Sequence, residues 1–193
     1  MKTATFLTFF ALCAISFSGK AQIQRGNVMV GGNIANLRLG LDDSKIVSIE
    51  LSPKAAWFVR NNLALGAYTN LGISSAKGES TITTYGLGAL SRYYGGADVD
   101  VLRHGRIFGE LTLGLGGINV GGGGAKTNGL EFGVGPGFAY FITPNIGLET
   151  LLKYNKVAGF GNATSQSDIG LSFGFQIYLP GRSTANKVKN DAQ

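Results

Sequence analysis

The chain has 193 residues, of which 31 are glycine and one is cysteine, and only 15% are charged, against about 25% in an average soluble domain. Because 44% of the residues are hydrophobic, the chain is not disordered by composition, and the absence of a Gly-X-Y repeat excludes collagen. The single cysteine excludes a disulfide or zinc-finger scaffold, and the formal net charge of +6 is too small to indicate nucleic-acid binding.

Residues 1–21 have the pattern of a cleaved secretory signal peptide. Lys2 provides a basic start, Ala4 to Phe17 is an almost unbroken apolar run, and Gly19 and Ala21 are the small residues expected before a cleavage site. The apolar run has 14 residues, fewer than the roughly 20 that a membrane-spanning helix needs. We therefore expect cleavage after Ala21 rather than a membrane anchor.

The rest of the chain shows no helical periodicity but alternates with a period of two, which is typical of strands with two different faces. We expect eight strands, over residues 27–39, 47–59, 63–74, 81–94, 106–118, 130–142, 145–155 and 168–179. They are about twice as long as the usual soluble strand of about 5 or 6 residues, and they match the roughly 9 to 11 residues of a tilted transmembrane strand.

The connections between these strands alternate in length. Those at 60–62 and 143–144 are tight, those at 41–44, 75–80, 119–127 and 156–166 are longer, and the one at 95–105 departs from the alternation by being long. This layout predicts an all-β fold, an eight-stranded antiparallel up-and-down transmembrane β-barrel within residues 22–179. Residues 180–193 are expected to form a polar, basic, flexible tail in the periplasm.

In the expected strands one face is apolar and the other consists mainly of Gly, Ala, Ser and Thr. The sequence of the first strand, residues 27–39, does not decide which of its two faces is the apolar one. A soluble barrel points its apolar face inwards, whereas a membrane barrel points it to lipid. A glycine-rich exterior with so few charges would be poorly soluble, and small residues suit a narrow lumen. We therefore expect a lipid-facing apolar exterior, with a soluble lipocalin-like carrier of an apolar ligand as the alternative.

Six charged residues lie on the small-residue face and are expected inside the barrel: Glu50, Lys54, Arg92, Glu110, Glu149 and Lys153. Three are acidic and three are basic. Because buried charges are costly unless they are paired, we expect a luminal ion-pair network with Arg92, Glu110 and Glu149 at its centre. The alternative is that some of these side chains lie near the barrel ends and are solvated.

Aromatic residues and prolines give two further expectations. An interfacial aromatic girdle is predicted near the end with the tight turns, formed by Trp57, Tyr93, Phe108, Tyr140, Phe141 and Tyr178. Pro53 and Pro136 lie within expected strands, and because proline has no N–H to donate, we expect a bulge or a pairing gap at each.

Four stretches carry a resemblance to the small eight-stranded outer-membrane β-barrels of Gram-negative bacteria, the OmpA-like and OmpX-like porin-family proteins: LSPKAAWFVRNNLALGAY, YGLGALSRYYGG, GVGPGFAYFITPNIGLE and IGLSFGFQIYL. The resemblance covers most of residues 27–179 and implies insertion into outer-membrane lipid. Ser172, Gly174, Ile177 and Leu179 resemble the terminal signal through which the barrel assembly machinery engages the last strand. Leu179 replaces the aromatic residue of that signal, and the tail follows it.

No catalytic, cofactor-binding or metal-binding pattern is evident. The stretch Gly121 to Thr127 lacks the glycine that precedes lysine in a phosphate-binding loop, and the only histidine, His104, has no nucleophile or acid pattern to orient it. We expect a non-enzymatic outer-membrane barrel with a largely filled lumen, which acts structurally or through loops that meet an unidentified extracellular partner. The alternatives are a small porin-like channel and an enzyme that uses His104.

Overall fold

The computed structural model describes residues 23–37, 46–76, 80–95, 105–122, 126–160 and 165–181. These ranges contain eight strands: β1 (Val28–Leu37), β2 (Ile46–Arg60), β3 (Leu63–Ala76), β4 (Ile82–Gly95), β5 (Gly105–Val120), β6 (Lys126–Thr143), β7 (Ile146–Gly159) and β8 (Gln166–Leu179). Within the described ranges, no α-helix has the length and apolar character needed to cross a bilayer. The expected signal peptide, His104 and residues 182–193 of the tail lie outside the described residues.

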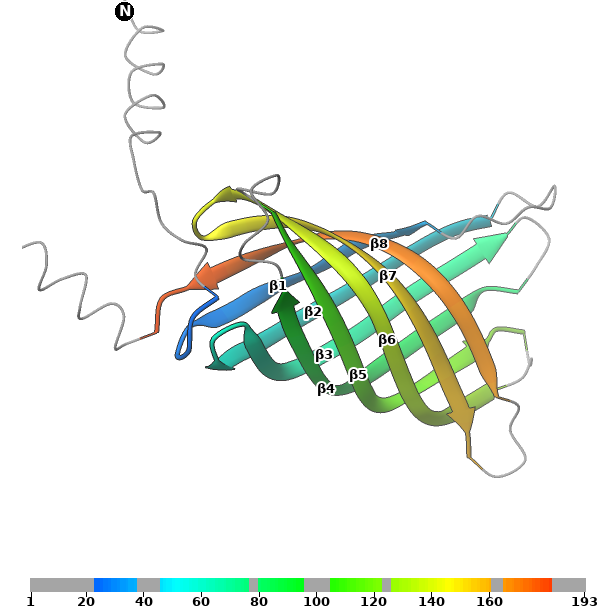
Figure 1. The fold of residues 1–193 in the computed structure, drawn as a ribbon. Helices are drawn as coiled ribbons and strands as arrows, with labels where there is room; N and C mark the ends of the chain where they lie inside the picture. The colour runs from blue at the N-terminus through cyan, green and yellow to red at the C-terminus, as the bar shows by residue number, and fades with distance from the viewer. Residues whose placement is uncertain are drawn as a thin grey trace, which may run out of the picture.

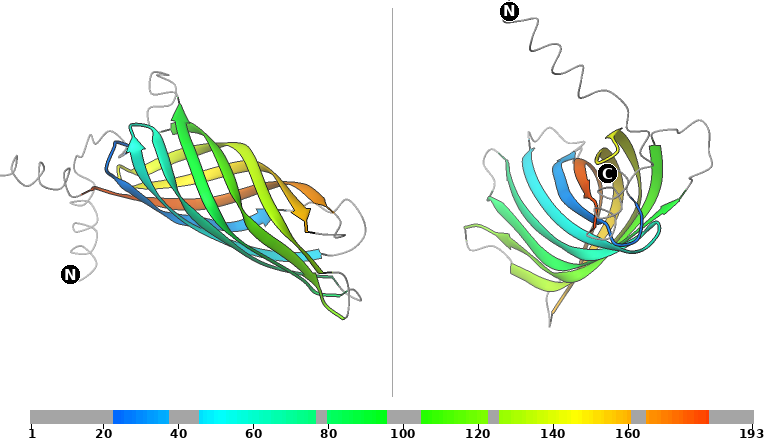
Figure 2. Two further views of the ribbon diagram at one scale, coloured as in Figure 1. Left: turned by 90° about the horizontal axis from the view of Figure 1, so that it is seen from below. Right: turned by 90° about the vertical axis from the view of Figure 1, so that its left-hand side faces the viewer.

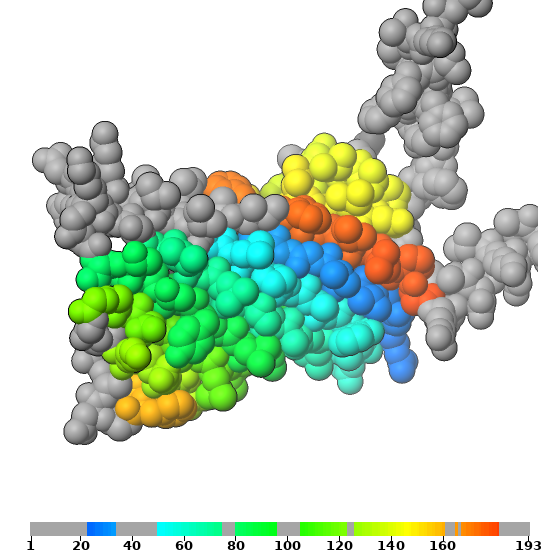
Figure 3. Space-filling model, turned by 180° about the vertical axis from the view of Figure 1, so that it is seen from behind, coloured from blue at the N-terminus to red at the C-terminus, as the bar shows by residue number. Residues whose placement is uncertain are grey.

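Each strand pairs antiparallel with its neighbours in the chain, and β8 pairs with β1, so that the sheet closes into an up-and-down barrel (Figure 1). The closing pair is in register from Val28 opposite Leu179 to Leu37 opposite Leu171, with one irregularity between Asn33 and Ala35. On the outer surface β1 accordingly lies between β8 and β2 (Figure 3). The predicted fold class and the eight predicted strands are confirmed.

The barrel has a turn end and a loop end, which Figures 1 and 2 show from three sides. At the turn end lie the start of β1, the end of β8 and the two-residue turns between β2 and β3 and between β6 and β7. In the first of these turns Asn62 has a φ of 66°, a left-handed conformation that Asn adopts more readily than most residues. β4 ends and β5 begins at this end, and the long connection expected between them falls outside the described residues.

Both prolines interrupt strand pairing on one side only. The ladder between β2 and β3 skips from Leu51 to Lys54, which leaves Pro53 unpaired with β3 although it faces Gly32 of β1. The ladder between β6 and β7 skips from Val134 to Gly137, while Pro136 stays opposite a residue of β5. The expected pairing gaps are therefore present, and each lies where the missing N–H would have had to donate.

The two faces of the strands differ as the period-two pattern predicts. Large apolar side chains point outwards along all eight strands, among them Leu71, Leu87, Leu115 and Ile169, each more than half exposed. The lumen contains the small residues together with the buried aromatic and charged side chains. This arrangement is the inverse of a soluble barrel and is the one that a lipid environment requires.

Candidate functional site

Aromatic side chains fill the lumen at the turn end. Phe58, Tyr94, Phe108, Phe141 and Tyr178 come from five strands and are each at most 6% exposed. Their ring centroids lie 5.1 to 6.4 Å apart in successive pairs, the spacing of favourable aromatic contacts. The hydroxyl groups of Tyr94 and Tyr178 are 2.8 Å apart and share a hydrogen bond. We call these five side chains the aromatic plug.

The plug corrects the predicted aromatic girdle. Trp57, Tyr93 and Tyr140 point outwards and are more than half exposed, whereas Phe108, Phe141 and Tyr178 are buried in the lumen. All six residues lie near the turn end, but height along the barrel does not determine the face, which follows from the parity of the residue within its strand. Phe108 and Tyr178 share their parity with the luminal Glu110 and Gln176, so the sequence contained the signal that separates the two groups.

A network of ion pairs lies next to the plug, and Arg92 is at its centre. The Arg92 side chain is wholly buried, and its Nη1 and Nη2 atoms lie 2.5 Å from Oε2 of Glu149 and from Oε2 of Glu110 respectively. Lys54 Nζ donates to Oε2 of Glu110 at 3.0 Å, and Lys153 Nζ lies 3.8 Å from Oε1 of the same carboxylate. The structure therefore brings together five of the six charged residues that were expected to interact.

Neutral groups complete this network. Gln176 Nε2 donates to Oε1 of Glu149 at 2.8 Å, and Arg92 Nη1 donates to the Tyr94 hydroxyl at 3.1 Å. The Arg92 guanidinium also lies over the ring of Phe108, 4.1 Å from its centroid, which adds a cation–π interaction. The charged network and the aromatic plug thus form one packed unit.

Glu50, the sixth residue, lies further towards the loop end. Ser52 Oγ donates to its Oε1 at 3.4 Å, and both residues line a luminal cavity. Two further carboxylates line the same cavity, Glu131 and Asp168, so the expected balance of three acids and three bases is wrong. Both lie on the inward-facing parity of their strands, and counting that parity in β6 and β8 would have included them.

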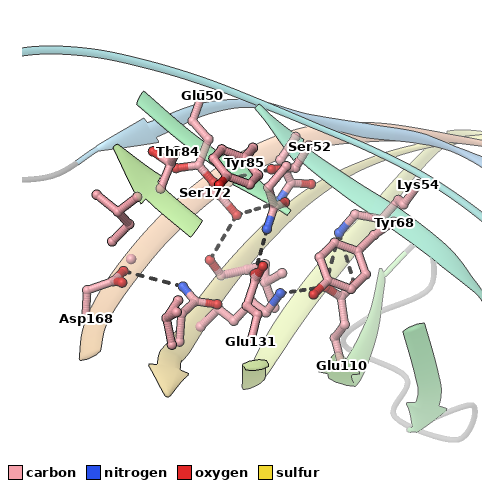
Figure 4. A pocket seen from close by; sticks show the side chains of 18 of the residues that line it. Glu50, Ser52, Lys54, Tyr68, Thr84, Tyr85, Glu110, Glu131, Asp168 and Ser172 are labelled. Atoms are coloured by element: carbon pink, nitrogen blue, oxygen red, sulfur yellow. Dashed lines mark hydrogen bonds and ion pairs between the residues drawn. The ribbon is translucent and has the colours of Figure 1, made fainter. Parts of the chain in front are cut away.

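The cavity has a volume of about 80 Å³ and extends from Lys54 and Glu110 towards the loop end. Figure 4 shows Glu50, Tyr68, Glu131, Asp168 and Ser172 around it. This volume is large enough for a few water-sized groups and too small for a drug-sized ligand. Among the described residues, no group of three His, Cys, Asp or Glu side chains is placed to hold a metal ion. We call this space the luminal cup.

Glycines make room for the luminal side chains. A Cβ atom on Gly137 would collide with the ring of the buried Phe108. Gly86 and Gly116 flank Glu131, and a Cβ atom on either would meet its Oε2 atom. Part of the high glycine content is therefore a packing requirement of a narrow barrel whose lumen holds large side chains.

The last strand contributes to every level of the lumen. Ser172 and Gly174 point inwards, whereas Ile177 and Leu179 are exposed on the outer face. These four residues are the ones that resemble the assembly signal. Of the two inward residues, Ser172 lines the cup, and the two exposed residues lie on the apolar exterior.

Comparison with known proteins supports the fold but assigns the chain to no protein family. No protein-family model matches the chain, and curated protein sequences give no match. Among solved structures, neisserial surface protein A is similar, with a TM-score of 0.56 and 21% identity over 78% of this chain and 95% of that chain. The N-terminal β-barrel domain of Pseudomonas aeruginosa OprF has a TM-score of 0.52 and 11% identity over 80% of this chain and 98% of that domain. At these identities the likeness is one of fold, the small eight-stranded outer-membrane barrel.

Proposed function

We propose that the chain is an integral protein of the bacterial outer membrane that acts without catalysis, either structurally or through its loop-end connections, and that its lumen does not conduct solutes. The observation that carries this proposal is the combination of an apolar exterior with a lumen filled at the turn end.

The exterior supports insertion into lipid. A closed barrel pairs its backbone groups between strands and leaves no open sheet edge, and this is the condition for β-structure to span a bilayer. The outward side chains are apolar around the whole circumference. The outward-facing Trp57, Tyr93 and Tyr140 lie on β2, β4 and β6 near the turn end, where aromatic side chains suit the boundary between lipid and water.

The lumen supports a barrel that does not conduct. Eight strands leave an interior just wide enough for side chains, and here the five rings of the aromatic plug and the wholly buried Met29 occupy it at the turn end. The next part of the lumen, on the side of the loop end, is filled by Arg92, Glu110 and Glu149. The Arg92 side chain there has no solvent exposure. A solute that entered from the loop end would meet this packed unit below the cup.

Two measurements test the proposal. After cell fractionation the mature chain is expected in the outer membrane, and the purified protein in detergent is expected to run faster on an unheated gel than after boiling. Recovery as a soluble periplasmic protein, or a mobility that does not change on heating, would contradict the membrane barrel.

Planar-bilayer recordings test the closed lumen separately. The folded protein is expected to give no stable conductance steps in 1 M KCl, under conditions in which a known porin does. Reproducible steps that scale with the amount of folded barrel would replace the closed barrel with the channel alternative, and the outer-membrane assignment would still stand.

A further inference from the structure

Charge is segregated between the two sides of the barrel wall. All five carboxylates of the described residues lie in the lumen, where four line the cup and the fifth, Glu149, pairs with Arg92. On the outside, the charged side chains of the described ranges are all basic and exposed: Arg25 and Arg60 at the turn end, Lys126 and Lys156 at the loop end. The outer surface of the described part of the chain therefore attracts anions.

A register shift turns Arg60 outwards at the turn end. Phe58 points into the lumen, so plain alternation would expose Val59 and return Arg60 to the lumen. The ladder between β2 and β3 instead shifts between Phe58 and Arg60, and both Val59 and Arg60 are exposed. A bulge of this kind re-aims a side chain, and here it places a guanidinium group beyond Trp57 on the outer rim of the barrel.

A tight turn holds a second arginine near the first. A backbone hydrogen bond of 3.2 Å closes the turn over residues 24–27, and Gly26 has a φ of 90°, which a type II turn requires at its third residue. Arg25 is the exposed second residue of this turn, and its backbone N–H donates to Oδ1 of Asn61, the residue after Arg60. The two arginines therefore lie at neighbouring points of the same rim.

The described residues provide no counter-ion at this rim. Neither Arg25 nor Arg60 forms an ion pair with another described residue. Glu110 and Glu149, the described carboxylates on the turn-end halves of their strands, are buried in the lumen and paired with Arg92. Two exposed guanidinium groups without local carboxylates favour an anionic partner.

The level of Arg60 along the proposed membrane barrel matches the phosphate layer of a bilayer. Trp57 and Tyr93 are each 59% exposed on the outer face, and aromatic side chains of this kind lie at the lipid–water boundary. Arg60 follows Trp57 by three residues, and at about 3.3 Å per residue and a strand tilt of about 40° it lies up to about 8 Å further from the membrane centre. The headgroup layer of one leaflet is about 5–8 Å thick, so this guanidinium group lies at the depth of the lipid phosphates.

The chemistry of the two side chains selects among lipids. The planar guanidinium group can donate to two phosphate oxygens at once. In phosphatidylglycerol the phosphate charge is uncompensated, whereas in phosphatidylcholine the lipid's own quaternary ammonium group balances it and is repelled by a basic rim. The rim therefore favours a headgroup with a net negative charge.

We propose that Arg60 and Arg25 form a binding site for the phosphate group of an anionic phospholipid in the leaflet next to the turn end. The inference rests on the proposed membrane barrel, and it adds the class of lipid and the two residues that select it. Because the short turns of outer-membrane barrels lie on the periplasmic side, this leaflet is the periplasmic one.

Quenching of Trp57 by brominated lipids tests the proposal on the folded full-length chain. All vesicles contain phosphatidylcholine with a minor share of phosphatidylglycerol, and the two sets differ only in which of these lipids has brominated acyl chains. Trp57 is the only tryptophan, so it reports on the lipids next to Arg60. Relative to its mole fraction, phosphatidylglycerol is expected to quench about fivefold more strongly than phosphatidylcholine, the factor that one basic residue contributes near an anionic lipid surface.

Variants locate the site on the rim. Arg60→Gln and Arg25→Gln are each expected to reduce the preference for phosphatidylglycerol to about twofold or less, and Arg60→Lys, which keeps the charge but loses the planar fork, should lie between Arg60→Gln and the unmodified chain. Lys126→Gln is the matched control, because it removes an exposed outer charge at the opposite end of the barrel and should leave the preference unchanged. A heat-shift gel confirms that each variant is folded.

Three results would overturn the proposal. They are equal quenching by the two lipids on the unmodified chain, an equal loss of preference in Lys126→Gln and Arg60→Gln, and a preference that both arginine variants leave intact. The second result would show a response to net charge alone, and the third would place the lipid site elsewhere. If neither brominated lipid quenches Trp57, the membrane barrel itself is contradicted, so failure of the lipid site and failure of the proposed function are distinguishable.

Discussion

Replacement of Arg92 by methionine is the sharpest test of the luminal network. Arg92 contacts both central carboxylates, and its side chain has no solvent exposure. After Arg92→Met, Glu110 keeps Lys54 at 3.0 Å and Lys153 at 3.8 Å, but Glu149 loses its ion-pair partner and keeps the neutral Gln176 donor. A buried carboxylate left without a cation should lower the free energy of unfolding by about 3–5 kcal/mol.

Two companion variants test whether the unpaired carboxylate causes this loss of stability. Lys54→Met removes one of three cations around Glu110, so its expected cost is smaller, about 1–3 kcal/mol. The double variant Arg92→Met with Glu149→Gln removes the isolated charge together with its partner. It is expected to be more stable than Arg92→Met alone, because the cost comes from the unpaired carboxylate rather than from the lost ion pair.

Equilibrium urea unfolding in lipid vesicles measures these differences through the fluorescence of Trp57. Trp57 is the only tryptophan of the chain and is 59% exposed on the outer face, so its emission should shift when it leaves the lipid. A loss below about 1 kcal/mol for Arg92→Met, or a double variant no more stable than Arg92→Met, would refute the reasoning from unpaired buried charge.

Three further predictions address the exterior and the packing. Leu113→Arg, on the outer face of β5, should lower the free energy of unfolding by about 2–4 kcal/mol in the same titration, and an unchanged midpoint would argue against contact with lipid. Gly137→Ala should cost about 1–3 kcal/mol because the new methyl group meets the Phe108 ring. Gly95→Ala is the control, because its Cβ would have no atom within 4 Å, and it should change the free energy of unfolding by less than about 0.5 kcal/mol. Equal effects of Gly137→Ala and Gly95→Ala would exclude the packing explanation. Trp57 fluorescence should be quenched by vesicles with brominated acyl chains, and emission that brominated lipid leaves intact would place the indole away from the bilayer.

Strand number, strand position and face were predictable because each depends on local sequence. A period-two pattern fixes which side chains share a face, and the outward Leu113 and inward Glu110 of β5 follow from it directly. The pairing gaps at Pro53 and Pro136 were predictable for the same reason, since a missing N–H is a property of the residue itself.

The partners inside the lumen were only partly predictable. Arg92 and Glu110 lie directly opposite each other on adjacent strands, so their pairing follows from the register of one hairpin. Arg92 and Glu149 lie on β4 and β7, which do not pair. Their contact depends on the closure of the barrel and on the diameter that closure sets, and neither quantity is encoded in a single strand.

Closure by β8 completes all three levels of the lumen at once. Tyr178 joins the plug through its hydrogen bond to Tyr94, Gln176 joins the network through Glu149, and Ser172 bonds to Asn33 across the seam with β1. The bond from Gln176 to Glu149 joins the paired strands β7 and β8, whereas Asn33 and Ser172 meet only when β8 pairs with β1. Until then these two buried groups lack each other, and unsatisfied polar groups are costly in an apolar environment. The outward side chains meet lipid on either side of the seam and do not distinguish the correct closing strand from another apolar one. The polar lumen therefore supplies the selectivity for the eighth strand, and partially closed barrels should be disfavoured relative to the closed one.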